Sequence, residues 1–164
     1  MLVLGIDPGL AITGYGLVAG DGSELEPIAH GVLRTPANTP IPDRLCQLHA
    51  ALLALLAQYR PDAAAVEELF FSTNARTAIM VGEARGVALL ALAQAGLPIS
   101  EYTPLQVKQS VTGYGQADKR QVQEMVRLLL NLGDIPRPDD AADALAVAVC
   151  HLHSSRLDLL LGAG

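Results

Sequence analysis

Two acidic residues, Asp7 and Glu67, each follow a short apolar segment, at a position where a side chain can take part in catalysis or bind a cation. Residues 2–6 are an apolar run followed by Asp7 and the turn dipeptide Pro8-Gly9, and Glu67 follows the apolar residues 63–66 in the same way. A carboxylate at the end of a buried strand must be solvated, paired or bound to a cation, because an isolated buried charge is unfavourable. Both acids are therefore candidates for cation binding. A capping role for Asp7 and simple solvent exposure of Glu67 or Glu68 are the alternatives.

A second acidic pair occurs near the C-terminus. Asp140 and Asp143 are three residues apart at the start of a predicted helix, so both project from one face. The alanines around them leave room beside the carboxylates. Ordinary negative charge at a helix N-terminus is the alternative for this pair, and Asp139 is the expected cap.

Carboxylates from three separated segments indicate a hard divalent cation rather than a soft metal. A cluster that holds two Mg²⁺ about 3.5–4 Å apart can hydrolyse a phosphodiester by in-line attack of water. Cys46 and Cys150 have no metal-ligand spacing and are interpreted as buried free thiols of a reducing cytosol. His151 and His153 are expected at a solvated helix end, so His and Cys ligation is not indicated.

The strands and helices that must position these acids follow one another in a simple order: three strands come first, and helices and strands alternate afterwards. The order predicts an α/β protein with a mixed five-stranded sheet flanked by helices. Strands are expected over residues 2–6, 12–19, 25–33, 63–69 and 98–102, and helices over 43–59, 74–95, 103–113, 118–132 and 140–154. Within the second helix, Gly82 and Gly86 would let another helix approach closely, either from this domain or from a second copy.

Composition indicates one globular domain over residues 1–156 with a C-terminal tail over 157–164. Hydrophobic residues make up 51% of the 164 residues and charged residues 17%, which excludes a disordered chain. No apolar run reaches the roughly 18 residues needed to span a bilayer, and no basic leader precedes the first strand. A cytoplasmic location without membrane contact is expected. The net charge of −6 argues against nucleic acid, although divalent cations would offset several acids.

Five segments carry a resemblance that covers nearly the whole chain in order: GIDPGLAITGYG, AVEELFF, ARGVALLALAQ, VKQSVTGYGQADKRQVQ and DDAADALAVAVCH. Together they are similar to the RuvC family of Holliday junction resolvases. The resemblance implies an RNase H-like fold, a homodimer, and metal-dependent, symmetrical nicking of two strands at a four-way DNA junction in recombination and DNA repair. It also implies two Mg²⁺ per active site, with Mn²⁺ as an alternative, and the RuvA-RuvB branch-migration complex as a partner. By position, the catalytic and metal-binding carboxylates of the family fall on Asp7, Glu67, Asp140 and Asp143.

The resemblance also bears on residues that would contact DNA. Lys108, Lys119 and Arg120 flank the glycine-containing loop at 113–115, where phosphate contacts are expected, and solvated surface cations are the alternative. In the family an aromatic residue matching Phe70 contacts unstacked junction bases, which agrees with the stacking of bases on aromatic rings. Arg76, at the start of the long second helix, is a further candidate.

Three rival functions remain open. Actin-like ATPases and sugar kinases also begin with a strand and a glycine-rich Asp turn, but they have two such lobes. A junction-binding module would lack the chemistry, and its four acids would then have no evident use. A ribonuclease H-type enzyme would share the metal chemistry and cut RNA–DNA hybrids. Cleavage assays with Mg²⁺ on a junction, a hybrid and a plain duplex separate these functions.

Overall fold

The computed structural model describes residues 1–68 and 74–162. Its elements agree with the predicted order, and their bounds are β1 (Leu2–Asp7), β2 (Ile12–Gly20), β3 (Leu25–Arg34), α1 (Ile41–Tyr59), β4 (Ala63–Glu67), α2 (Ala75–Gln94), β5 (Ile99–Tyr102), α3 (Pro104–Thr112), α4 (Lys119–Leu129) and α5 (Asp139–Leu161). Asn74 caps α2 as its sequence position predicts, because its side chain accepts hydrogen bonds from the first-turn N–H groups of Arg76 and Thr77.

The sheet has the strand order β3-β2-β1-β4-β5. The first three strands pair antiparallel, whereas β4 is parallel to both β1 and β5. The mixed five-stranded α/β sheet that the sequence predicts is therefore confirmed. Because β1 is central, its side chains Val3, Leu4 and Ile6 are completely buried.

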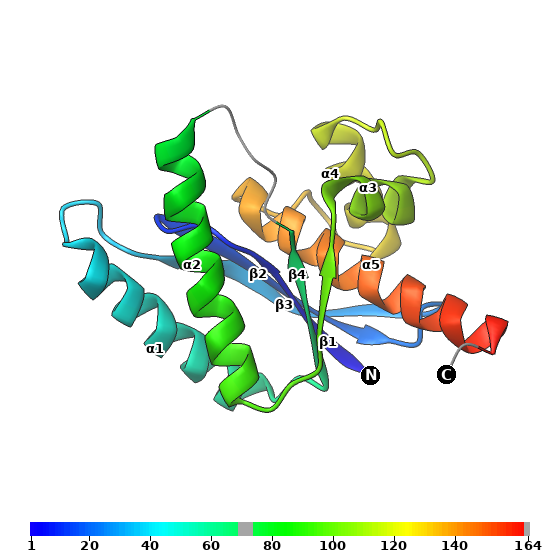
Figure 1. Cartoon of the computed structure of the whole chain (residues 1–164). Coiled ribbons are helices and arrows are strands. Elements are labelled where there is room, and N and C mark those ends of the chain that lie inside the picture. Colours follow the sequence, from blue (N-terminus) through cyan, green and yellow to red (C-terminus); the bar gives the residue numbers. More distant parts are fainter. Residues whose placement is uncertain (69–73, 163–164) are drawn as a thin grey trace.

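Helices cover both faces of this sheet (Figure 1). On one face, Leu4 and Ile6 of β1 pack with leucines of α1 and α2, including Leu48 and Leu92. On the other face, Val3 belongs to a core formed with α5, α3 and α4. Alternate residues of β1 thus enter opposite cores, as the pleat of a strand requires.

Helix α5 is longer than predicted. It continues past residue 154 to Leu161 and ends at Gly162, whose φ of 69° is the left-handed conformation that favours glycine at a helix end. Its last turns expose leucines, with Leu159 78% exposed. Residues 157–161 of the predicted tail therefore extend α5, and the division of the chain at residue 156 stays a prediction.

Two predictions about burial are wrong. Cys46 is exposed on α1, whereas Cys150 is buried as expected, and both are free thiols. His151 is buried rather than solvated, and its Nδ1 lies 2.9 Å from the Tyr102 hydroxyl. Burial lowers the pKa of His151. Both errors concern which side of a helix faces the sheet, which depends on tertiary packing.

Two helices, α2 and α5, are long and apolar enough to cross a membrane by length and composition alone. The sequence-based expectation that no segment reaches that length is therefore wrong for these helices. Half of the apolar window of α5 is buried within the protein. Core helices of soluble proteins meet the same criteria, so the finding is weak evidence for a membrane span.

Candidate active site

The first two acids meet at one edge of the sheet. In the parallel pairing of β1 and β4, Ile6 lies beside Val66, so Asp7 and Glu67 follow at adjacent positions. Ala65, two residues before Glu67, packs in the core under α5. Because alternate residues of a strand share a face, Glu67 points to the α5 side of the sheet.

The second acidic pair is brought to this edge by a glycine. Gly14 of β2 is the register partner of Asp7. A Cβ atom on Gly14 would lie 2.0 Å from the backbone oxygen of Asp140, so only glycine permits the observed approach of α5 to the sheet. The first turns of α5, which carry Asp140 and Asp143, therefore lie directly over β2 beside the end of β1.

Burial and like charges raise the pKa values of these acids. Burial is the largest cause that raises the pKa of Asp7 to about 8, and the charge of Glu67 adds to it, followed by those of Asp143 and Asp140. Burial and the charge of Asp143 raise the pKa of Glu67 to about 7. The pKa of Asp143 is also raised, again chiefly by burial. Buried acids that repel one another are typical of functional sites, and a bound cation would relieve the repulsion.

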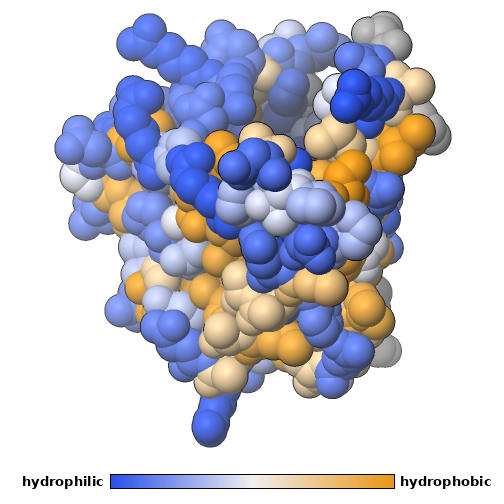
Figure 2. Space-filling model, turned by 90° about the vertical axis from the view of Figure 1, so that its left-hand side faces the viewer, coloured by the Kyte–Doolittle hydropathy of each residue, from blue (hydrophilic) through white to orange (hydrophobic). Residues whose placement is uncertain are grey.

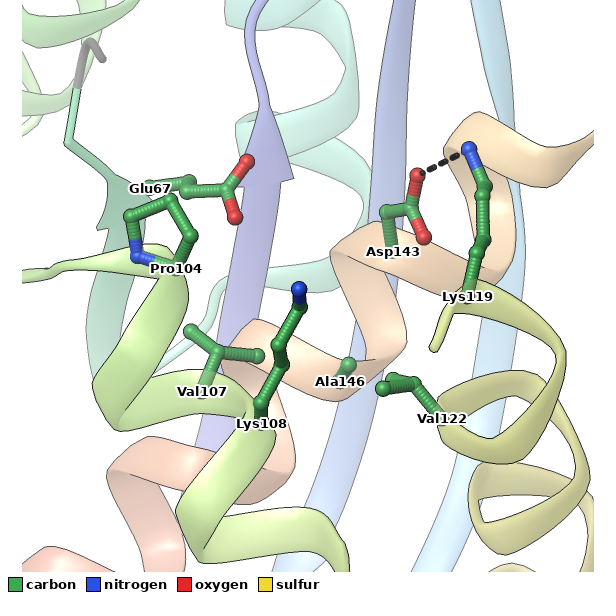
Figure 3. Close-up of a pocket in the computed structure, with 8 residues that line it drawn as sticks. All are labelled: Glu67, Pro104, Val107, Lys108, Lys119, Val122, Asp143 and Ala146. Carbon is green, nitrogen blue, oxygen red and sulfur yellow. Dashed lines mark ion pairs between the residues drawn. The ribbon is translucent and has the colours of Figure 1, made fainter. Parts of the chain in front are cut away.

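A pocket of about 230 Å³ opens between β4, α3, α4 and α5. It is lined by Glu67, Pro104, Val107, Lys108, Lys119, Val122, Asp143 and Ala146. Figure 3 shows Glu67 on one side of this pocket and Asp143 on the other, with the amine of Lys108 pointing between them. The predicted DNA contacts Lys108 and Lys119 thus lie in the same pocket as two of the predicted catalytic acids.

Lys119 has an ion-pairing role that the sequence did not reveal. Its Nζ lies 3.0 Å from Oδ2 of Asp143 and 3.4 Å from Oδ2 of Asp139. The carboxylate of Asp143 faces Lys119, across the pocket from Glu67 (Figure 3). The adjacent acid Asp139 therefore serves as a lysine partner, and its side chain makes no capping bond to α5.

Carboxylate oxygens are the ligands that Mg²⁺ and Mn²⁺ prefer, so the donor chemistry of the site fits these ions. Within residues 1–68 and 74–162, however, no three His, Cys, Asp or Glu side chains stand close enough together to hold a metal ion as they lie. The carboxylate chemistry therefore suits these ions, whereas the described side chains as they lie do not form a complete ligand set.

The remaining predicted site residues lie apart from this pocket or outside the described chain. Arg120 is exposed beside Lys119, and Arg76 is exposed in the first turn of α2. Glu68 is exposed, and its backbone N–H donates to the carbonyl of Tyr102, which favours Glu67 over Glu68 as the site acid. Phe70 falls outside the described residues.

A hydrogen-bond network that no local sequence signal indicates supports the turn after Asp7. The Thr13 hydroxyl donates to the carbonyl of Gly9, and the Thr35 hydroxyl donates to that of Leu10. Arg44 is buried on α1 and donates from Nε to the Thr35 hydroxyl, 2.9 Å away. Thr35 and Arg44 lie on segments that only the fold brings to this turn, so spacing could not have revealed their contacts.

Comparison with known proteins identifies the family of this chain and agrees with its fold. The family model described as Crossover junction endodeoxyribonuclease RuvC matches residues 3–151. The RuvC of Desulfitobacterium hafniense is 60% identical over 157 residues, which cover 96% of this chain and 95% of that protein. The RuvC of Rubrobacter xylanophilus is 58% identical over 163 residues, which cover 99% and 91%.

Solved structures of Holliday junction resolvases also match this chain. The structure of T. thermophilus RuvC in complex with Holliday junction substrate matches with a TM-score of 0.91 and 42% identity over 96% of both chains. The yeast mitochondrial Holliday junction resolvase matches with a TM-score of 0.67 at 15% identity over 97% of this chain and 82% of that one, a likeness of fold alone. The chain therefore has an RNase H-like fold and belongs to the RuvC family of Holliday junction resolvases, the crossover junction endodeoxyribonucleases.

Proposed function

We propose that this chain cuts four-way DNA junctions by paired symmetrical nicks, in recombination and DNA repair, through metal-dependent hydrolysis. One observation supports this choice of active site. Acids from β1, β4 and α5 lie at one edge of the sheet, and the charges of Glu67, Asp143 and Asp140 help to raise the pKa of Asp7. The proposed catalytic and metal-binding residues are Asp7, Glu67, Asp140 and Asp143.

Two Mg²⁺ are the proposed cofactors, with Mn²⁺ as an alternative. When bound, they would supply an activated water and charge stabilisation of the leaving oxygen in an in-line displacement. Asp7 lies at the end of the central strand, between Glu67 on β4 and the first turns of α5, so it is the proposed shared ligand. The network of Thr13, Thr35 and Arg44 would hold the turn beside it during the reaction.

The proposed DNA contacts surround the acids. Lys108 projects into the pocket between Glu67 and Asp143, where it would contact a phosphate of the strand to be cut (Figure 3). Lys119, Arg120 and Arg76 would contact the DNA backbone. Phe70 would stack on an unpaired base at the junction centre. The related T. thermophilus protein, solved with a Holliday junction substrate, supports this kind of DNA as the ligand.

Two symmetrical nicks require two active sites, so we propose a homodimer. Gly86 of α2 is exposed, and a Cβ atom added there would meet nothing within 4 Å, while Ile79 and Leu90 of the same helix are 63% and 51% exposed. The view in Figure 2 shows apolar residues among polar ones on the side of the molecule that carries α1. The apolar, glycine-containing face of α2 is the proposed contact with the second copy. Family resemblance adds the RuvA-RuvB branch-migration complex as a partner, and the cysteine usage supports the cytoplasm as the proposed location.

The test compares Mg²⁺-dependent cutting of a four-way junction, an RNA–DNA hybrid and a plain duplex by the full chain. We expect cutting of the junction, and we expect Asp7→Asn to abolish cutting while junction binding is retained. Undiminished cutting by Asp7→Asn would contradict the metal role of Asp7. Preferential cutting of the hybrid would contradict the proposed substrate.

A further inference from the structure

The ion pair between Lys119 and Asp143 has a consequence for metal binding. We infer that Lys119 is the internal counter-ion of the metal-free site, and that a divalent cation must displace it from Asp143 before the ligand set can form. This inference rests on the proposed metal-dependent function. It adds a competition between a lysine and the metal ion for one carboxylate.

The contacts of the two pocket lysines differ sharply. Lys119 reaches both Asp143 and Asp139, at 3.0 and 3.4 Å. Lys108 lines the same pocket but forms no ion pair with any residue in the described part of the chain. The two lysines thus bring the same charge to one pocket, and Lys119 alone of the two binds a predicted metal ligand.

Asp143 is the predicted metal ligand that Lys119 already engages. Its carboxylate is engaged by Lys119 across the pocket from Glu67 (Figure 3). No group of three donors within residues 1–68 and 74–162 is close enough to hold an ion. Asp143 already lines the pocket, so its release from Lys119 would free this carboxylate for a cation there.

The Lys119 side chain can move away from Asp143 without disturbing helix α4. It is the first residue of α4, and its side chain is 56% exposed on a flexible stem. The start of α4 is held independently by Asp118 and Gln121, which form a reciprocal capping box. Once displaced, the ammonium group remains beside the site and is free to contact a DNA phosphate. Metal binding would in this way switch Lys119 from a carboxylate partner to a DNA contact.

The experiment is a titration of the DNA-free full chain with MgCl₂ at constant ionic strength, followed by the shift in melting temperature. Lys119→Gln removes the competitor, and Lys108→Gln is the matched control because it removes the same charge from the same pocket. Since exposed or half-exposed ion pairs contribute up to about 1 kcal/mol, we expect Lys119→Gln to lower the Mg²⁺ midpoint by about fivefold. Lys108→Gln is expected to lower it by less than about twofold, through the general loss of positive charge. Lys119→Arg retains the pair and should leave the midpoint near that of the wild type.

Each outcome decides the inference. Equal decreases for the Lys119→Gln and Lys108→Gln variants would overturn it, since general electrostatics would then explain both. An unchanged midpoint in Lys119→Gln would also overturn it. So would the absence of any Mg²⁺-dependent shift in wild type and variants while Mg²⁺-dependent junction cutting persists. If the wild type neither responds to Mg²⁺ or Mn²⁺ nor cuts a junction, the proposed function itself fails, which is a distinguishable result.

Discussion

Substitution of Gly14 by alanine would separate the two halves of the active site. A Cβ atom at this position would lie 2.0 Å from the backbone oxygen and 2.5 Å from the carbonyl carbon of Asp140. Real Cβ atoms essentially never come closer than 3.0 Å to such atoms, so the start of α5 must move away from β2 by about 1 Å. The atoms in the way are backbone, and no rotation of a side chain can relieve the clash.

Gly14→Ala is expected to lower both the stability of the protein and its rate of catalysis. Overpacking of this kind typically destabilises by about 1–3 kcal/mol, and for a protein of this size each kcal/mol lowers the melting temperature by about 2–4 °C. The effect on catalysis should be larger, because a misplacement of about 1 Å among catalytic groups can reduce the rate on the order of 100-fold. Junction binding should change little, since Lys108 and Arg76 lie on other elements.

The assay is single-turnover cleavage of a four-way junction with saturating Mg²⁺, beside a melting curve and a binding isotherm. Gly133→Ala is the control, because a Cβ atom there would meet nothing within 4 Å. It should retain the activity and melting temperature of the wild type. Normal cleavage and a normal melting temperature in Gly14→Ala would refute the claim that close contact between β2 and α5 assembles the site.

Two further predictions concern pH and assembly. Because the folded-state pKa values of Asp7 and Glu67 are raised to about 8 and about 7, the folded protein holds these protons more tightly than the unfolded chain does. The melting temperature of the metal-free chain should therefore fall from about pH 4 to pH 8, and Asp7→Asn should reduce that fall. A flat profile would contradict the raised pKa values of these acids. Gly86→Glu places a charge on the apolar face of α2 without an internal clash, so it should convert the proposed dimer to a folded monomer in sedimentation experiments. A dimer that persists in this variant would exclude this face as the interface.

Much of the fold could be predicted from the sequence because its signals are local. Apolar runs closed by turn residues indicated the strands, and a capping residue such as Asn74 marked the start of a helix. The end of α5 was missed because no glycine or proline interrupts the chain between Ser154 and Gly162, where the helix finally stops. The burial of His151 and the exposure of Cys46 were missed because both depend on how a helix is rotated against its neighbours.

The sequence by itself determined which residue types are present and which elements carry them: Asp7 and Glu67 at strand ends, and Asp140 and Asp143 on one helix face. Tertiary structure alone decided their arrangement. The parallel register placed Glu67 beside Asp7, and the missing side chain of Gly14 allowed α5 to approach them. The pairing of Lys119 with Asp143 also arose only in the folded chain, because side chains of residues on separate helices meet through packing, which sequence spacing does not encode.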